Sequence, residues 1–121
     1  MKLIKTKFFL VFSLCFLLLK VNSQSYNMAN QTVTDCNASF FDSDNTPTGN
    51  YGHSENLLFS ICPNGADSII MSFTSFCTEQ NLDVLYFFDG PNLASPMIGS
   101  PQSGNTSLPP DVIATSGCLT I

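Results

Sequence analysis

The sequence predicts an all-β fold, a two-layered antiparallel β-sandwich, and three observations support this. After residue 23, apolar residues occur in short runs that are separated by glycine, proline, asparagine and serine. All seven glycines and all seven prolines lie in this part of the chain. No stretch of it repeats apolar residues at the helical period of about 3.6 residues. Short strands joined by tight turns are typical of a sandwich.

Residues 1–23 have the features of a signal peptide for export. Three lysines precede the apolar run 8–19, and small residues close the segment. As a helix, this run would span about 18 Å, well short of the roughly 30 Å hydrocarbon core of a membrane. We therefore expect cleavage between Ser23 and Gln24, with no membrane span afterwards and a secreted or cell-surface protein. An uncleaved anchor is the alternative.

The charge distribution excludes several kinds of partner. All four lysines lie within the first 20 residues and there is no arginine, so the segment from Gln24 onward carries nine acidic residues and no strong cation. Binding to nucleic acid or to an anionic membrane requires clustered lysine and arginine. We therefore expect no nucleic-acid partner.

The first half of the exported segment is predicted as a leader followed by strands. Residues 24–32 are polar, and we expect them to form a leader into a domain that covers 33–121. A strand is expected over 55–61, ending at the turn residues 63–65, where Asn-Gly favours a positive φ.

The next strands are predicted from two different apolar patterns. Ile69, Met71 and Phe73 alternate with smaller or polar residues, which indicates a half-buried strand. Residues 83–88 are apolar on both faces, which predicts a central strand covered on both sides. Asp89 follows it, and we expect its carboxylate to accept hydrogen bonds from the backbone of its own turn.

The last part of the chain is expected to close the domain. A short apolar run at 97–98 is followed by a turn-rich segment, and 112–121 is expected to form two strands around a turn at 116–117.

His53, the only histidine, lies in a polar loop and is expected to be exposed and inert. No Gly-x-Ser-x-Gly motif occurs, and we do not expect an enzyme.

Four cysteines remain after the signal, and we expect them to form structural disulfides. They are Cys36, Cys62, Cys77 and Cys118. An exported protein keeps disulfides, and no C-x-x-C pair is present for zinc or redox chemistry. The spacing leaves all three possible pairings open.

From about residue 33 to its end the chain resembles a CUB domain, in the version found in secreted proteins of gliding bacteria. The most specific block is Asp83-x-Leu85-x-Phe87-Phe88-Asp89-Gly90. The supporting positions are Cys36, Gly49-Asn50-Tyr51, Cys62, Ile69-x-Met71-x-Phe73-x-x-Phe76, Pro96-x-Ile98-Gly99, Gly104, Ile113 and Leu119-x-Ile121.

The resemblance implies a jelly-roll-like antiparallel sandwich with Cys36 bonded to Cys62. Cys77 departs from the family's usual place for the third cysteine, and its candidate partner by elimination is Cys118. The chain stops at Ile121, within what resembles the family's penultimate strand. We therefore expect a partial domain, with further polypeptide following Ile121, because missing strands would leave an open sheet edge and an uncovered apolar face.

The resemblance also implies a calcium site. Its ligands would be Glu79 and Asp83, with Tyr51 in support, and a third aspartate would lie past Ile121. Carboxylate oxygens suit Ca²⁺, which takes about six to eight oxygen ligands, so two carboxylates would bind it weakly. The competing interpretation is that Glu79 and Asp83 are solvated turn residues.

The expected function is that of a secreted, non-catalytic binding or adhesion module that recognises extracellular protein or carbohydrate, with calcium ordering its loops. An ancillary domain of a larger secreted protease or glycosidase is the second interpretation. A truncated product that does not fold is the third.

Overall fold

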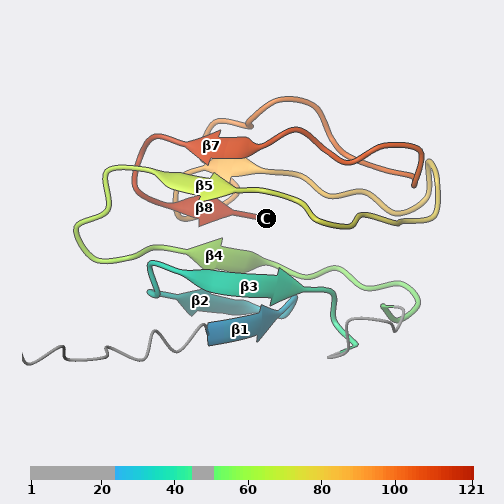
Figure 1. Ribbon diagram of the computed structural model, residues 1–121, viewed down its shortest axis with the longest axis horizontal. Helices are drawn as coiled ribbons and strands as arrows, with labels where there is room; N and C mark the ends of the chain where they lie inside the picture. The colour runs from blue at the N-terminus through green and yellow to red at the C-terminus, as the bar shows by residue number, and fades with distance from the viewer. Residues whose placement is uncertain (1–23, 45–50) are drawn as a thin grey trace, which may run out of the picture.

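The computed structural model describes residues 24–44 and 51–121, and within these ranges it confirms an all-β fold without helices (Figure 1). The expected signal peptide lies outside the described residues. The strands are β1 (Gln24–Asn27), β2 (Gln31–Val33), β3 (Ala38–Phe41), β4 (Phe59–Ile61), β5 (Ile69–Met71), β6 (Phe88–Asp89), β7 (Val112–Ala114) and β8 (Leu119–Thr120). In the described ranges no helix long and apolar enough to cross a membrane is found.

The strands form one sheet of four strands, in the order β2-β4-β8-β6, and two separate pairs, β1-β3 and β5-β7. Strand β8 is antiparallel to β4 and β6, and β5 is antiparallel to β7. The pairs β1-β3 and β2-β4 are parallel, so the expected purely antiparallel arrangement is confirmed only in part. The cause is that β1 and β2 lie in different sheets, and so do β3 and β4. The chain therefore crosses to the other sheet between β1 and β3, and again between β2 and β4, and returns to each sheet in its original direction.

The segment expected to be a polar leader contains β1 and the start of β2. Strand β1 pairs residue by residue with β3. The Met28 N–H donates to the Phe41 carbonyl at 3.0 Å, and the Tyr26 ring lies 6.0 Å from that of Phe59. Tyr26 in this strand and Met28 directly after it are thus the apolar anchors of an otherwise polar segment, which is why composition alone indicated a leader.

The alternation predicted for 69–73 is confirmed. Ile69 and Met71 in β5 and the following Phe73 are half-buried, whereas Ile70 is 64% exposed. The turn before β5 has the expected form, because Gly65 has a φ of 77° and the Ala66 N–H donates to the Pro63 carbonyl at 3.3 Å.

The central strand predicted over 83–88 is wrong. Only β6 forms there, and it ends the order of the four-stranded sheet. Leu85 and Phe88 make single bridges with Gln102 and Met97, and Tyr86 is 46% exposed. The neighbouring segment 96–102 is rich in proline and glycine, so it supplies isolated bridges and not a continuous ladder.

The core lies where β7 and β8 meet the chain before β6. Its buried residues are Phe87, Val112, Ala114, Leu119 and Ile121. The rings of Phe73 and Phe87 meet edge to face, with centroids 5.9 Å apart. Phe59 is buried as well, and the ring of Phe40 packs against it at 4.9 Å.

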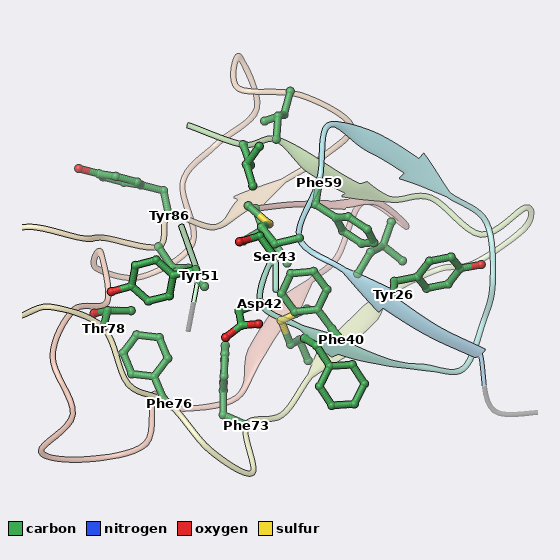
Figure 2. Close-up of a pocket in the computed structure, with 18 of the residues that line it drawn as sticks. Tyr26, Phe40, Asp42, Ser43, Tyr51, Phe59, Phe73, Phe76, Thr78 and Tyr86 are labelled. Carbon is green, nitrogen blue, oxygen red and sulfur yellow. The ribbon is translucent and has the colours of Figure 1, made fainter. Parts of the chain in front are cut away.

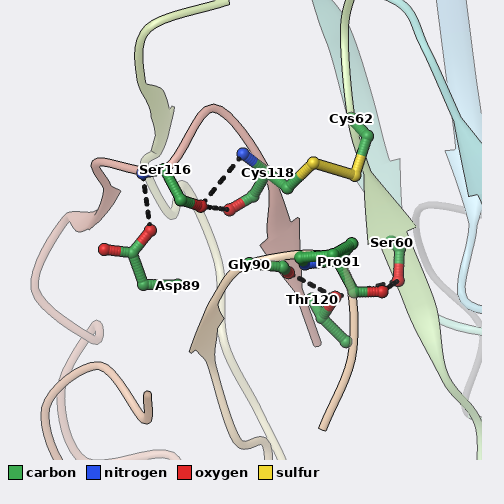
Figure 3. The surroundings of a disulfide bond; sticks show 8 residues. All are labelled: Ser60, Cys62, Asp89, Gly90, Pro91, Ser116, Cys118 and Thr120. Carbon is green, nitrogen blue, oxygen red and sulfur yellow. Dashed lines mark hydrogen bonds between the residues drawn. A yellow bond between two sulfur atoms is a disulfide. The ribbon is translucent and has the colours of Figure 1, made fainter. Parts of the chain in front are cut away.

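Cys62 is bonded to Cys118, so both expected pairs, Cys36 with Cys62 and Cys77 with Cys118, are wrong (Figure 3). The register explains the bond. Ile61 pairs with Leu119 across antiparallel β4 and β8, which places Cys62 and Cys118 directly opposite each other one position further on. Their Cα atoms are 4.4 Å apart. Cys36 and Cys77 are unpaired and exposed.

A buried pair of hydroxyl groups lies beside this disulfide (Figure 3). The oxygens of Ser60 and Thr120 are 2.9 Å apart, and the Thr120 hydroxyl donates to the Gly90 carbonyl at 2.7 Å. These bonds satisfy polar groups inside the sheet, and they join β4, β8 and the turn after β6.

Candidate functional site

The structure brings together the three residues expected to form the calcium site. The Tyr51 hydroxyl donates to Asp83 Oδ2 at 2.7 Å. The Tyr51 hydroxyl oxygen in turn accepts a hydrogen bond from the Glu79 N–H at 2.9 Å. Tyr51 therefore joins the loop before β4 to a turn that is 28 to 32 positions further along the chain.

The turn 79–83 has a defined conformation. The N–H groups of Leu82 and Asp83 donate to the Glu79 carbonyl at 3.1 and 3.0 Å. Asn81 has a φ of 64°, a left-handed conformation that asparagine tolerates. Its N–H donates to the Ser103 hydroxyl at 2.9 Å. The turn is thus fixed both within itself and to the segment before β7.

Tyr51 is a hydrogen-bond donor in this arrangement over the whole neutral pH range. Burial raises the pKa of the Tyr51 hydroxyl above its ordinary value, and the hydrogen bond to the Asp83 carboxylate raises that pKa further. The phenol stays protonated and orients the carboxylate that it bonds.

The oxygen groups gathered here match calcium in kind, but they are few. Asp83 and Glu79 carry carboxylates, Tyr51 carries a hydroxyl, and hard cations prefer such oxygens. Within residues 24–44 and 51–121, however, no group of three or more histidine, cysteine, aspartate or glutamate side chains is close enough to hold a metal ion. Calcium takes about six to eight oxygens, so water would have to supply most of the shell at this site.

A large groove of 1310 Å³ adjoins these residues, and Tyr51 and Asp83 are part of its lining (Figure 2). Its wall is rich in aromatic and aliphatic side chains, among them Tyr26, Phe40, Phe59, Ile69, Met71, Phe73 and Phe76. Strands β3 and β5 both contribute to it.

Acidic side chains also line the groove. They are Asp35, Asp42, Glu55 and Asp83. Burial raises the pKa of the Asp42 carboxyl, and the nearby Asp44 and Glu55 carboxylates raise it further, although a bond from the Asp44 N–H opposes this. The pKa of the Tyr26 hydroxyl is raised mainly by its hydrogen bond to Asp35. The groove is therefore lined by apolar side chains and also carries negative charge.

The sequence did not point to this groove. Phe40 and Phe41 stand beside each other in a polar stretch, with no period long enough to indicate a shared surface. Asp42 follows them as an ordinary loop residue. Only the pairing of β3 with β1, which the polar character of 24–27 concealed, brings these side chains to the groove wall.

Asp89 does not bond within its own turn as expected. Its carboxylate accepts a hydrogen bond from the Thr115 hydroxyl at 2.8 Å. It also accepts one from the Ser116 N–H at 2.8 Å (Figure 3). The Thr115 hydroxyl bond and then the Ser116 bonds lower the pKa of Asp89 to about 2. Asp89 therefore stabilises the turn between β7 and β8. His53 is exposed, as expected from its polar loop.

No protein-family model matches this chain, and no solved structure matches it.

Proposed function

We propose that this protein is a secreted, non-catalytic binding module with a CUB-like sandwich, and that calcium orders the loops at one end of its binding surface. The observation that supports it best is the contact of Tyr51 with Asp83 and Glu79. The CUB resemblance selected these three residues from the sequence alone. In the structure Tyr51 bonds the Asp83 carboxylate and the backbone N–H of Glu79.

Calcium would act at this site as a structural ion. Carboxylates from Asp83 and Glu79 would hold it, and Tyr51 would orient Asp83 through its hydrogen bond. Bound there, the ion would fix the turn 79–83 relative to the loop that carries Tyr51. Because binding sites of small sandwiches lie on such loops, this order would favour recognition of a protein or carbohydrate ligand.

The excess of acidic side chains over basic ones favours cation binding in general. The chain after residue 20 has nine acidic residues and no lysine or arginine, so no internal cation competes with a bound metal for these carboxylates. A general attraction would bind calcium diffusely, however, whereas the proposed site would bind it at two named carboxylates.

Isothermal titration with CaCl₂ at constant ionic strength distinguishes these cases. We expect weak, saturable binding by the protein, and a loss of at least about tenfold in affinity in both Glu79→Gln and Asp83→Asn, a change of about 1.4 kcal/mol. Asp67→Asn and Asp111→Asn remove the same charge at exposed positions outside the groove and should leave the affinity unchanged. Equal affinity in all five proteins would refute the site.

The second candidate, an ancillary domain of a larger secreted protease or glycosidase, places the same binding surface beside a catalytic domain. The groove favours neither candidate over the other. The two differ in the coding sequence that adjoins this one, where a catalytic domain would support the second.

A further inference from the structure

We propose that the groove between β3 and β5 binds an extended peptide strand with basic ends from another protein, and that the backbone of this strand pairs with the free edges of both β3 and β5. This proposal rests on the proposed function as a binding module, and it adds the class of partner that the module binds. It does not depend on calcium.

The sheet arrangement provides two strand edges for this pairing. Within the described part of the chain, β3 pairs only with β1, and β5 pairs only with β7. The Phe41 carbonyl faces the β1 side, where it accepts the Met28 N–H at 3.0 Å. Because successive residues of a strand direct their backbone groups to opposite edges, Ala38 and Phe40 present theirs at the other edge of β3.

The direction of these strands suits one inserted strand. In Figure 1 the arrows of β3 and β5 point the same way, and residues of both strands line the same groove. A strand running in the opposite direction between them would be antiparallel to both. It would convert two separate pairs, β1-β3 and β5-β7, into one continuous sheet facing the four-stranded sheet.

The size and lining of the groove favour a peptide over a small molecule. Its volume of 1310 Å³ exceeds the range of about 300 to 1,000 Å³ that is usual for small-molecule pockets. The half-buried side chains of Phe40, Met71 and Phe73 lie along its wall. An inserted strand with alternating apolar residues would bury one of its faces against them.

The negative charge of the groove favours a strand from another protein over a second copy of this chain. Asp35, Asp42 and Glu55 line the groove, and no lysine or arginine follows residue 20. A second copy of the domain would bring nine further acidic residues and no cation. Lysine or arginine at the ends of a foreign strand would relieve the repulsion among the groove carboxylates.

A labelled peptide tests this directly, because the chain contains no tryptophan and a tryptophan in the probe can be followed without background. The probe has about nine residues, with valine and threonine alternating, tryptophan at one apolar position and lysine at both ends. Two matched peptides replace either the end lysines by glutamate or two inner threonines by proline, which removes backbone N–H donors. Binding to the purified protein is followed by tryptophan anisotropy, and hydrogen exchange is followed by mass spectrometry.

We expect saturable binding of the lysine peptide, with the glutamate and proline peptides each at least about tenfold weaker. Exchange should slow in 38–41 and 69–71. The double variant Asp42→Asn with Glu55→Gln should lose about tenfold in affinity, whereas Asp67→Asn with Asp111→Asn should bind as the parent does.

The inference would be overturned by no binding of the lysine peptide, by equal binding of the proline peptide, or by protection that leaves out 38–41 and 69–71. A self-associated protein that excludes the peptide would also overturn it, since a second copy would then occupy the groove. These peptide titrations are made in EDTA, without calcium. Failure of the calcium site is therefore distinguishable from failure of this inference.

Discussion

At the scale of single residues, the carboxylates of this protein differ according to what surrounds them. Asp89 accepts hydrogen bonds from Thr115 and Ser116, which lowers its pKa to about 2. Asp42 lies among other acids in a partly buried position, which raises its pKa. The first carboxylate stabilises a turn in its charged form, and the second is available for a cation from outside.

The pH dependence of stability provides a test for Asp89. Because its pKa in the folded protein lies below the ordinary value of 3.8, its contribution to stability is complete above about pH 4 and is lost as the pH falls through about 2. We expect Asp89→Asn to unfold at lower urea concentration than the parent at pH 7, and the difference to shrink between pH 4 and pH 2. The control Asp111→Asn, at an exposed position, should follow the parent at every pH. A constant difference over this range would contradict the role of the charged carboxylate.

At the scale of elements, the sequence predicted those strands whose pattern is local and missed those that depend on a distant partner. The alternation of Ile69, Met71 and Phe73 is visible in five residues, and the structure confirms it. Strand β1 is polar and is stabilised by pairing with β3, which no local pattern reveals. The prediction of a strand over 83–88 was wrong for a related reason. The neighbouring segment 96–102, and not the composition of 83–88, limits the ladder to β6.

The turn between β7 and β8 gives a second test. Gly117 has a φ of 84°, and a Cβ placed there would lie 2.2 Å from the Ala66 carbonyl oxygen. Gly65 has a similar φ of 77° with nothing within 4 Å of its Cβ position. We expect Gly65→Ala to cost about 1 to 2 kcal/mol from backbone conformation alone. Gly117→Ala should cost more, since the backbone of β8 or of the turn at Ala66 must also move.

Urea unfolding of the two alanine variants measures this difference. The pair is matched in substitution and in φ, so only the contact with Ala66 distinguishes them. Equal destabilisation would show that the turn does not pack against the segment before β5 as described.

At the scale of the whole molecule, the Cys62–Cys118 bond connects segments 56 positions apart and fixes β4 beside β8. Closing a loop of this length stabilises a protein by about 4 kcal/mol in the chain-entropy account. The all-β class did not depend on which cysteines pair, so it was confirmed even though the implied pairing was wrong. The groove and the contact of Tyr51 with Asp83 depend on the tertiary arrangement, which spacing in the sequence does not determine.

The measurement that tests this arrangement most directly is disulfide mapping of the native protein by non-reducing proteolysis and mass spectrometry, after its free thiols are alkylated. The register of β4 and β8 predicts one linked peptide pair, containing Cys62 and Cys118, and alkylated Cys36 and Cys77. A linked pair containing Cys36 and Cys62 would contradict the register at the centre of the four-stranded sheet, and with it the groove that β3 and β5 line.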